Sequence, residues 1–207
     1  MYIIKAKNIS KKFGNNIVFE NLNFFAKKDK STAIVGPSGR GKSTLLRCFI
    51  GLLDVDKGTI EINGKKMVKN GKYVNKKEKE DILKNISIVF QEHNLFPNLN
   101  VINNLKIVKN DDVKIQNLLK DFGLSGKENL YPANLSGGQK QRLSIIRTLL
   151  LDPKIILFDE PTSSLDDENR VKIANILKNL NANSYSVVLV THDEKLLNLI
   201  DADIFSM

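Results

Sequence analysis

A glycine-rich stretch near residue 40 has the residue types and spacing needed to hold a chain of phosphates. It fits the phosphate-loop pattern G-x-x-x-x-G-K-[ST] with Gly36, Pro37, Ser38, Gly39, Arg40, Gly41, Lys42, Ser43 and Thr44. The glycines let several backbone N–H groups face one point, and the following helix aims its positive end there. Lys42 would reach the β- and γ-phosphates, and Ser43 would offer a hydroxyl to Mg²⁺. A chance glycine-rich turn is the alternative, but the apolar run before the loop and the helical pattern after it argue against that.

A second candidate group follows an apolar run near residue 158. The run Ile155–Phe158 is followed directly by Asp159 and Glu160. Ligands bind at the carboxyl ends of strands in a parallel sheet, so both carboxylates would face a ligand there. Asp159 could hold Mg²⁺, and Glu160 could orient or deprotonate an attacking water. A strand followed by a solvated acidic turn is the alternative, which the phosphate loop disfavours.

A third glycine-rich stretch, Leu135–Gln139, lies far from the first in the sequence. Ser136, Gly137, Gly138 and Gln139 combine a hydroxyl, two glycines and the start of a helix, which together make another anion site. A plain reading is that Ser136 caps the helix and the glycines are flexible. That reading is compatible with the anion site, because the stretch would open a helix in either case.

These residues need an α/β scaffold to position them. Short apolar runs predict strands at 33–35, 86–90, 155–158 and 187–190, and helical patterns occur at 44–50, 113–122 and 137–151. The alternation predicts a largely parallel sheet. Alternating residues near the N-terminus, with a turn at Gly14-Asn15-Asn16, predict antiparallel strands. The charged segment Lys65–Asp81 is expected to be a solvated loop that leads into a short helix.

Composition narrows the class of protein. The 207 residues suffice for one domain, and no apolar run approaches the ~20 residues that a membrane span requires. The single cysteine, Cys48, excludes an internal disulfide and fits a reducing cytoplasm. The net charge is +9, but the lysines are scattered in a chain that is also rich in Asn and Ile. We therefore expect no nucleic-acid partner.

Leu135–Gln139, continued by Lys140-Gln141-Arg142, resembles the signature of the ATP-binding cassette family, for which LSGGQ is highly specific. The resemblance covers nearly the whole chain and implies further site residues. Gln91 would be the Q-loop glutamine near Mg²⁺ and the attacking water, and His192 the switch histidine that contacts the γ-phosphate. Phe13 would stack on adenine, as an aromatic residue usually does in the family. Taken singly, each of these three would pass for an ordinary surface or core residue.

The resemblance implies an assignment of site residues and a domain plan. The catalytic set would be Glu160, His192, Gln91 and Lys42, and the metal set Ser43, Gln91 and Asp159. The fold would be a P-loop NTPase core of the RecA-like type, with a mostly parallel sheet, an N-terminal antiparallel β subdomain and an inserted α-helical subdomain. The whole chain, 1–207, would be one ATPase domain, with the core at about 1–91 and 152–207 and the helical subdomain at about 92–151.

The family mechanism implies partners as well as cofactors. Two copies would pair head to tail, so that Mg²⁺-ATP on the phosphate loop of one meets Ser136–Gln139 of the other. The homodimer would drive integral membrane permease subunits from the cytoplasmic face of the cell membrane, and Glu92–Leu105 would touch the permease.

The transported substrate is indicated only by local likenesses. Leu45–Cys48, Phe90–Pro97 and Tyr131–Asn134 resemble importers of polar amino acids, which would add a substrate-binding protein. A lipoprotein-release or macrolide-export ATPase is the alternative. A DNA-repair ATPase of the same family is disfavoured because the chain lacks sustained heptads and a zinc-binding cysteine set.

Overall fold

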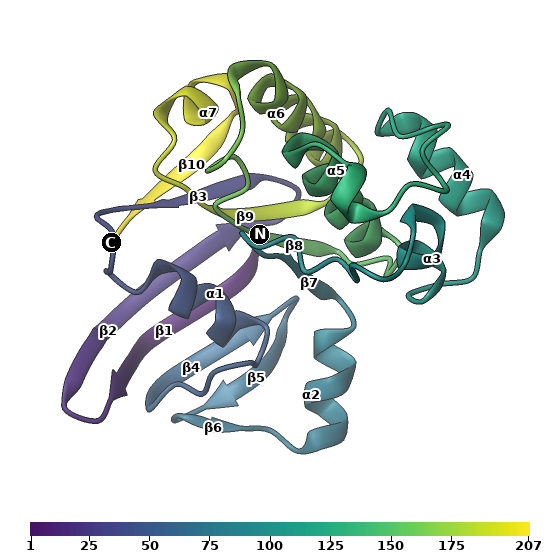
Figure 1. The fold of residues 1–207 in the computed structure, drawn as a ribbon. Helices are drawn as coiled ribbons and strands as arrows, with labels where there is room; N and C mark the ends of the chain where they lie inside the picture. Colours follow the sequence, from purple (N-terminus) through teal and green to yellow (C-terminus); the bar gives the residue numbers. More distant parts are fainter.

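The computed structural model describes all residues, 1–207, and confirms an α/β fold built on two sheets (Figure 1). One sheet has the strand order β2-β1-β4-β5-β6 and is antiparallel, and the other has the order β10-β3-β9-β8-β7 and is parallel. The strands are β1 (Tyr2–Phe13), β2 (Asn16–Lys27), β3 (Ser31–Val35), β4 (Lys57–Ile62), β5 (Lys65–Lys69), β6 (Lys72–Tyr73), β7 (Ile86–Val89), β8 (Ile155–Asp159), β9 (Ser186–Val190) and β10 (Ala202–Ser206). The helices are α1 (Lys42–Phe49), α2 (Lys76–Leu83), α3 (Val101–Lys106), α4 (Asp112–Asp121), the 3₁₀ helix η1 (Pro132–Asn134), α5 (Gly137–Leu149), α6 (Asp167–Ala182) and α7 (Glu194–Leu199).

The parallel sheet is apolar on both faces because both faces are covered. Every residue of β8 and β9 is buried, which explains why these strands appear as continuous apolar runs. Successive residues of β8 enter different cores. Leu157 packs with α1 and the antiparallel sheet, whereas Phe158 packs with α5, α6 and α7. The four strands expected from these runs are confirmed, and their carboxyl ends meet at one edge.

The antiparallel sheet lies against α1 on one side of the parallel sheet (Figure 1). β1 and β2 form a long hairpin that turns at Gly14, whose φ of +57° suits glycine. The expected antiparallel strands near the N-terminus are therefore confirmed. The shared core includes Ile4 and Ala6 of β1, which alternate with outward-facing lysines.

The expectation of a solvated loop over Lys65–Asp81 is wrong in its first half. Residues 65–73 form the hairpin of β5 and β6, and only the short helix α2 follows as expected. Met67 and Val68 are buried in the core below the sheet. Asn70 and Gly71, both with positive φ, make the two-residue turn, which is the common signal for a tight hairpin. The four lysines of residues 65–73 obscured the strand pattern, because only Met67 and Val68 in this stretch are buried.

The helices α3, α4 and α5 build a separate core beside the parallel sheet (Figure 1). Leu105, Leu119 and Leu143 are fully buried there, one from each helix. The expected helices near 113–122 and 137–151 are confirmed, and α5 ends at Leu149, ahead of Pro153. None of the helices has the length and apolar character needed to cross a membrane.

Candidate functional site

The glycine-rich loop connects β3 to α1, as the motif requires, and lines a hollow of about 750 Å³. Gly41, with φ +86°, ends the loop, and a Cβ there would lie 2.3 Å from a methyl group of Val18. The loop can therefore fold under the β1–β2 hairpin only with glycine at this position. The lining residues are Val18, Gly36, Pro37, Ser38, Gly39, Gly41, Lys42, Ser43, Thr44, Gln91, Glu160, Val190 and His192.

Lys42 projects over its own loop from the first turn of α1. Its Nζ donates to the carbonyl oxygens of Gly36 and Pro37, both at 2.8 Å, and the residue is only 7% exposed. No side chain caps the N-terminus of α1. The helix end therefore presents backbone N–H groups and an ammonium group to the same hollow, which together favour a polyanion.

Ser43 and Asp159 meet at the edge of this hollow. Ser43 Oγ donates to Asp159 Oδ1 at 2.7 Å, and Asp159 is buried at the carboxyl end of β8. A hydroxyl and a carboxylate are hard oxygen ligands of the kind that would hold Mg²⁺ beside phosphate oxygens. No cluster of three or more His, Cys, Asp or Glu side chains exists that could bind a metal by itself. The donor set thus fits a magnesium ion that arrives with a phosphate chain.

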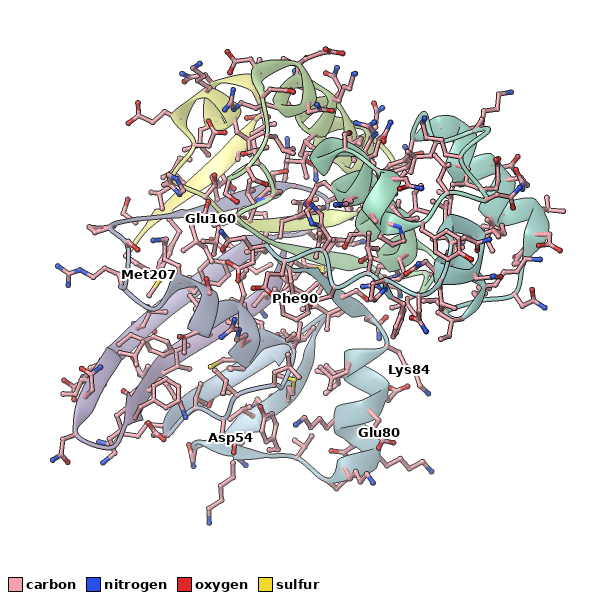
Figure 2. All side chains as sticks on the ribbon, viewed as in Figure 1. Asp54, Glu80, Lys84, Phe90, Glu160 and Met207 are labelled. Carbon is pink, nitrogen blue, oxygen red and sulfur yellow. The ribbon has the colours of Figure 1, made fainter.

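Glu160 and His192 contact each other in the hollow. His192 Nδ1 lies 2.8 Å from Glu160 Oε1, although 32 residues separate the two in sequence. Glu160, labelled in Figure 2, is a non-glycine residue with φ +51°, anchored by its N–H to the carbonyl oxygen of Val190. Left-handed backbone at a non-glycine residue concentrates at functional sites. Its carboxylate is 14% exposed and can therefore accept a proton from a water in the hollow.

Gln91, directly after Phe90 at the end of β7, also lines the hollow. Its Nε2 donates to Ser163 Oγ at 3.4 Å, in the segment between β8 and α6. The structure thus brings together most of the residues predicted from the phosphate loop, the acidic strand end and the Q-loop glutamine. They come from three strand ends and one loop.

Besides Asp159, which contacts the lining residue Ser43, three predicted groups do not line the hollow. Arg40 is exposed and absent from the lining, and Phe13 is 51% exposed at the hairpin tip, where Lys11 Nζ lies 5.0 Å from its ring centroid. Ser136–Gln139 lies apart at the start of α5, where Ser136 accepts from Gln139 N–H and the Gln139 side chain accepts from Ser136 N–H. The second anion-binding helix end and the phosphate loop therefore do not share a hollow within one copy.

A polar network connects the start of α5 to α6, and sequence reasoning missed it. Arg142 Nη1 donates to Asn169 Oδ1 at 3.0 Å, and Asn169 donates in turn to Asp166. A Cβ on Gly138 would lie 2.2 Å from Asn169 Oδ1, so the glycine is required for this contact. The first turns of α5 and Asp166, which precedes α6, are thus fixed to each other.

A second missed group supports the turn that carries His192. Asp193 Oδ2 accepts from Arg170 Nε at 2.6 Å and from Thr162 Oγ1 at 2.8 Å. Burial raises the pKa of Asp193, but these bonds outweigh burial and hold the pKa below its usual value. Asp193 therefore stays ionised and fixes the segments after β8 and β9 relative to each other. An acidic residue after the histidine was the only sequence signal for it.

Comparison with known proteins agrees with this geometry. A family model described as ABC transporter matches residues 19–163. A methionine import ATP-binding protein of Clostridium tetani is 38% identical over 204 residues, which cover 94% of this chain and 63% of that protein. An L-cystine import ATP-binding protein of Bacillus subtilis is 38% identical over 200 residues, covering 92% and 76%. The dimeric structure of the ATP-binding cassette MJ0796 in a post-hydrolysis state, bound to ADP and Pi, is 32% identical and superposes with a TM-score of 0.84, covering 99% of this chain and 94% of that one.

Proposed function

The chain belongs to the ABC transporter family as one of its ATPases, and we propose that it acts as a head-to-tail homodimer that drives a membrane permease. One observation carries the dimer. The phosphate loop and the Glu160–His192 pair share a hollow, whereas Ser136–Gln139 opens a helix elsewhere on the same copy. A second copy, facing the first, would supply the anion-binding helix end that each hollow lacks.

Within this proposal the polar groups of the hollow, and Phe13 outside it, have defined tasks. Lys42 and the loop N–H groups bind the phosphates, Ser43 and Asp159 hold Mg²⁺ with help from Gln91, and Phe13 stacks on the base. Mg²⁺ supplies charge neutralisation on the phosphates when it is bound. Glu160 orients and deprotonates the attacking water. His192 holds the Glu160 carboxylate and also contacts the γ-phosphate. Loss of phosphate weakens the contact between the copies and lets them separate.

Mixing two inactive variants tests the dimer. Lys42→Ala damages the phosphate loop and Ser136→Arg blocks the helix end, so each pure variant is expected to be inactive. In the mixed dimer both defects fall on one composite site and the other site is intact. An equal mixture forms half mixed dimers with one working site each, so activity should return to about a quarter of wild type. Turnover measured by phosphate release reports this directly.

If each copy used its own Ser136, no mixture would recover activity, and the dimer proposal would fail. The matched control mixes Lys42→Ala with Glu160→Gln, whose defects lie in the same hollow. There the mixed dimer has two damaged sites, because each copy brings one defective hollow. Recovery in the first mixture and none in the second is the expected pair of results.

We place the permease contact at a groove of about 310 Å³ where β7 and α5 meet. Phe90, labelled in Figure 2, and His93 line it together with Arg147 and Ser144 of α5. Arg147 donates to the carbonyl oxygens of Asn94 at 2.6 Å and His93 at 3.4 Å, which fixes the segment after Gln91. Burial lowers the pKa of His93, which favours the neutral ring in the groove. A permease segment seated here would be connected to the site through Gln91.

Replacing Arg147 by Ala tests this groove. We expect the isolated chain to hydrolyse ATP within about twofold of wild type, because Arg147 lies outside the nucleotide hollow. Transport by the complete complex should fall about tenfold, because losing two bonds of ~1 kcal/mol or more frees the segment that couples the groove to Gln91. Lys178→Ala, an exposed cation on α6, is the control. Equal losses of hydrolysis and transport would contradict a coupling role.

The substrate proposal is import of polar amino acids. It rests on the L-cystine import relative, whose name gives that substrate, and on the local likenesses around residues 45–48, 90–97 and 131–134. The chain would then sit at the cytoplasmic face of the membrane with permease subunits and a substrate-binding protein. We also propose a core at about 1–91 and 152–207 and a helical subdomain at about 92–151 as the two units that move within each copy.

A further inference from the structure

A second polar hollow, of about 580 Å³, opens on the antiparallel sheet and shares no residue with the nucleotide site. No hydrophobic residue lines it. The sheet contributes its outer face, because the inner face packs on the core (Figure 1). The lining residues are Lys5, Lys7, Asn8, Asn21, Lys57, Gly58, Thr59, Glu61, Lys66 and Asn70.

Strand register gathers the lysines. Lys5 stands opposite Glu61 on the neighbouring strand, and Glu61 stands opposite Lys66 on the next, so one row crosses β1, β4 and β5. Lys7 stands opposite Thr59 one step along the sheet. Because side chains alternate along a strand, these residues share the outer face, while the neighbouring Ile4, Ala6, Ile60 and Ile62 are buried.

The charges in this hollow are unbalanced. Glu61 is its only carboxylate and is already paired with Lys5 at 2.7 Å. Lys7, Lys57 and Lys66 are exposed and form no ion pair, unlike Lys27, Lys65 and Lys109 elsewhere on the surface. Four lysines and one glutamate leave three positive charges around one concavity, which focuses the field inside it.

The backbone is shaped to create the concavity. The pairing of β1 with β4 shifts register between Lys7 and Ser10, which marks a bulge at Asn8, a residue with φ +49°. Gly58 faces this bulge so closely that a Cβ would lie 2.5 Å from the Asn8 carbonyl oxygen. Asn21 and Asn70, also with positive φ, close the hollow with short amide side chains.

We propose that this hollow binds a small soluble anion that carries two or more phosphate groups. Three ammonium groups without ion pairs can neutralise more than one phosphate, and the amides add neutral donors. A nucleobase would find no face on which to stack, because the exposed rings of Tyr2 and Phe25 pack on each other, with centroids 5.3 Å apart, outside the lining. A lipid bilayer would find no apolar side chain to insert. The site thus favours a wholly polar ligand over nucleic acid or membrane.

The β1–β2 hairpin contributes residues to both hollows, so a ligand in one could affect the other. β1 and β2 line the hollow at Lys7 and Asn21, and β2 carries Val18 into the wall of the nucleotide hollow. Phosphates that bridge β1 and β4 would fix the base of this hairpin.

Calorimetric titration with inorganic tripolyphosphate tests the proposal. The full chain is used with Lys42→Ala, so that the phosphate loop does not dominate, at about 50 mM salt, where screening is moderate. One binding site is expected. Adding Lys7→Glu and Lys57→Glu should weaken it more than about tenfold, because each reversal replaces an attraction by a repulsion. Lys120→Glu with Lys178→Glu, two exposed unpaired lysines of the helical layers, makes the same charge change and should leave affinity within about twofold.

Lys66→Glu, on a different strand, serves as an independent variant in case the double change disturbs the bulge. Loss of binding in it supports the site. Three results would overturn the proposal: no tripolyphosphate binding in the Lys42→Ala chain, equal loss in the two charge-matched pairs, or unchanged affinity in Lys66→Glu and in the Lys7/Lys57 pair. Tighter, Lys7-dependent binding of single-stranded DNA or of anionic lipid vesicles would overturn the assignment of the ligand.

Discussion

Replacing Glu160 by Gln is expected to slow ATP hydrolysis about a thousandfold and leave ATP affinity within about threefold. The amide keeps the size of the carboxylate and can still bond His192 Nδ1, which lies 2.8 Å away. It cannot take a proton from water, because an amide nitrogen and oxygen are both too weakly basic. Chemistry stops while the nucleotide remains bound, and the contact between two copies persists.

The accumulated species should be a dimer, which light scattering distinguishes from the 23.3 kDa monomer. Single-turnover hydrolysis of labelled ATP measures the chemical step separately from product release. The matched control is Glu194→Gln, which neutralises an exposed carboxylate two residues after His192 that forms no ion pair. A monomer at saturating Mg²⁺-ATP, or wild-type turnover in the variant, would contradict the role assigned to Glu160.

Sequence reasoning succeeded where a site is local or lies at a strand end. The phosphate loop is continuous in sequence, so its pattern specified both its shape and its place between β3 and α1. Asp159 and Glu160 were predictable because they directly follow a buried apolar run, and parallel strands bring their carboxyl ends to one edge. His192 and Gln91 came from family resemblance, since a single histidine or glutamine has no pattern of its own.

The features that the sequence did not predict depend on contacts between segments that are distant in the chain. Residues 65–73 form a hairpin because Met67 and Val68 are buried in the core under the sheet. The local pattern of charges does not indicate this burial. The link from Arg142 through Asn169 to Asp166 joins residues 27 apart or less, but it exists only because Gly138 allows α5 and α6 to approach. The second polar hollow, on the antiparallel sheet, likewise depends on the register in which β1, β4 and β5 pair. Scattered lysines in the sequence became a cluster only after the strands paired.

Replacing Lys42 by Ala should reduce hydrolysis at least about a hundredfold and weaken ATP binding as well, because a buried cation aimed at the phosphates acts on both the ground state and the transition state. Its Nζ is poised over the loop by the carbonyl oxygens of Gly36 and Pro37, and no other lysine or arginine lines the hollow. Lys42→Met keeps the apolar stem, so equal losses in both variants assign the effect to the ammonium group rather than to packing.

Arg40→Ala is the sharper control, because Arg40 belongs to the same loop but does not line the hollow. Its backbone N–H stays in the loop, so we expect turnover within about threefold of wild type, whereas a direct charge contact with phosphate would be worth more. ATP affinity from fluorescence titration and turnover from phosphate release separate the two effects. Retained turnover in Lys42→Ala would mean that the loop's N–H groups and the end of α1 suffice to hold the transferred phosphate, and the ammonium group would lose its assigned role.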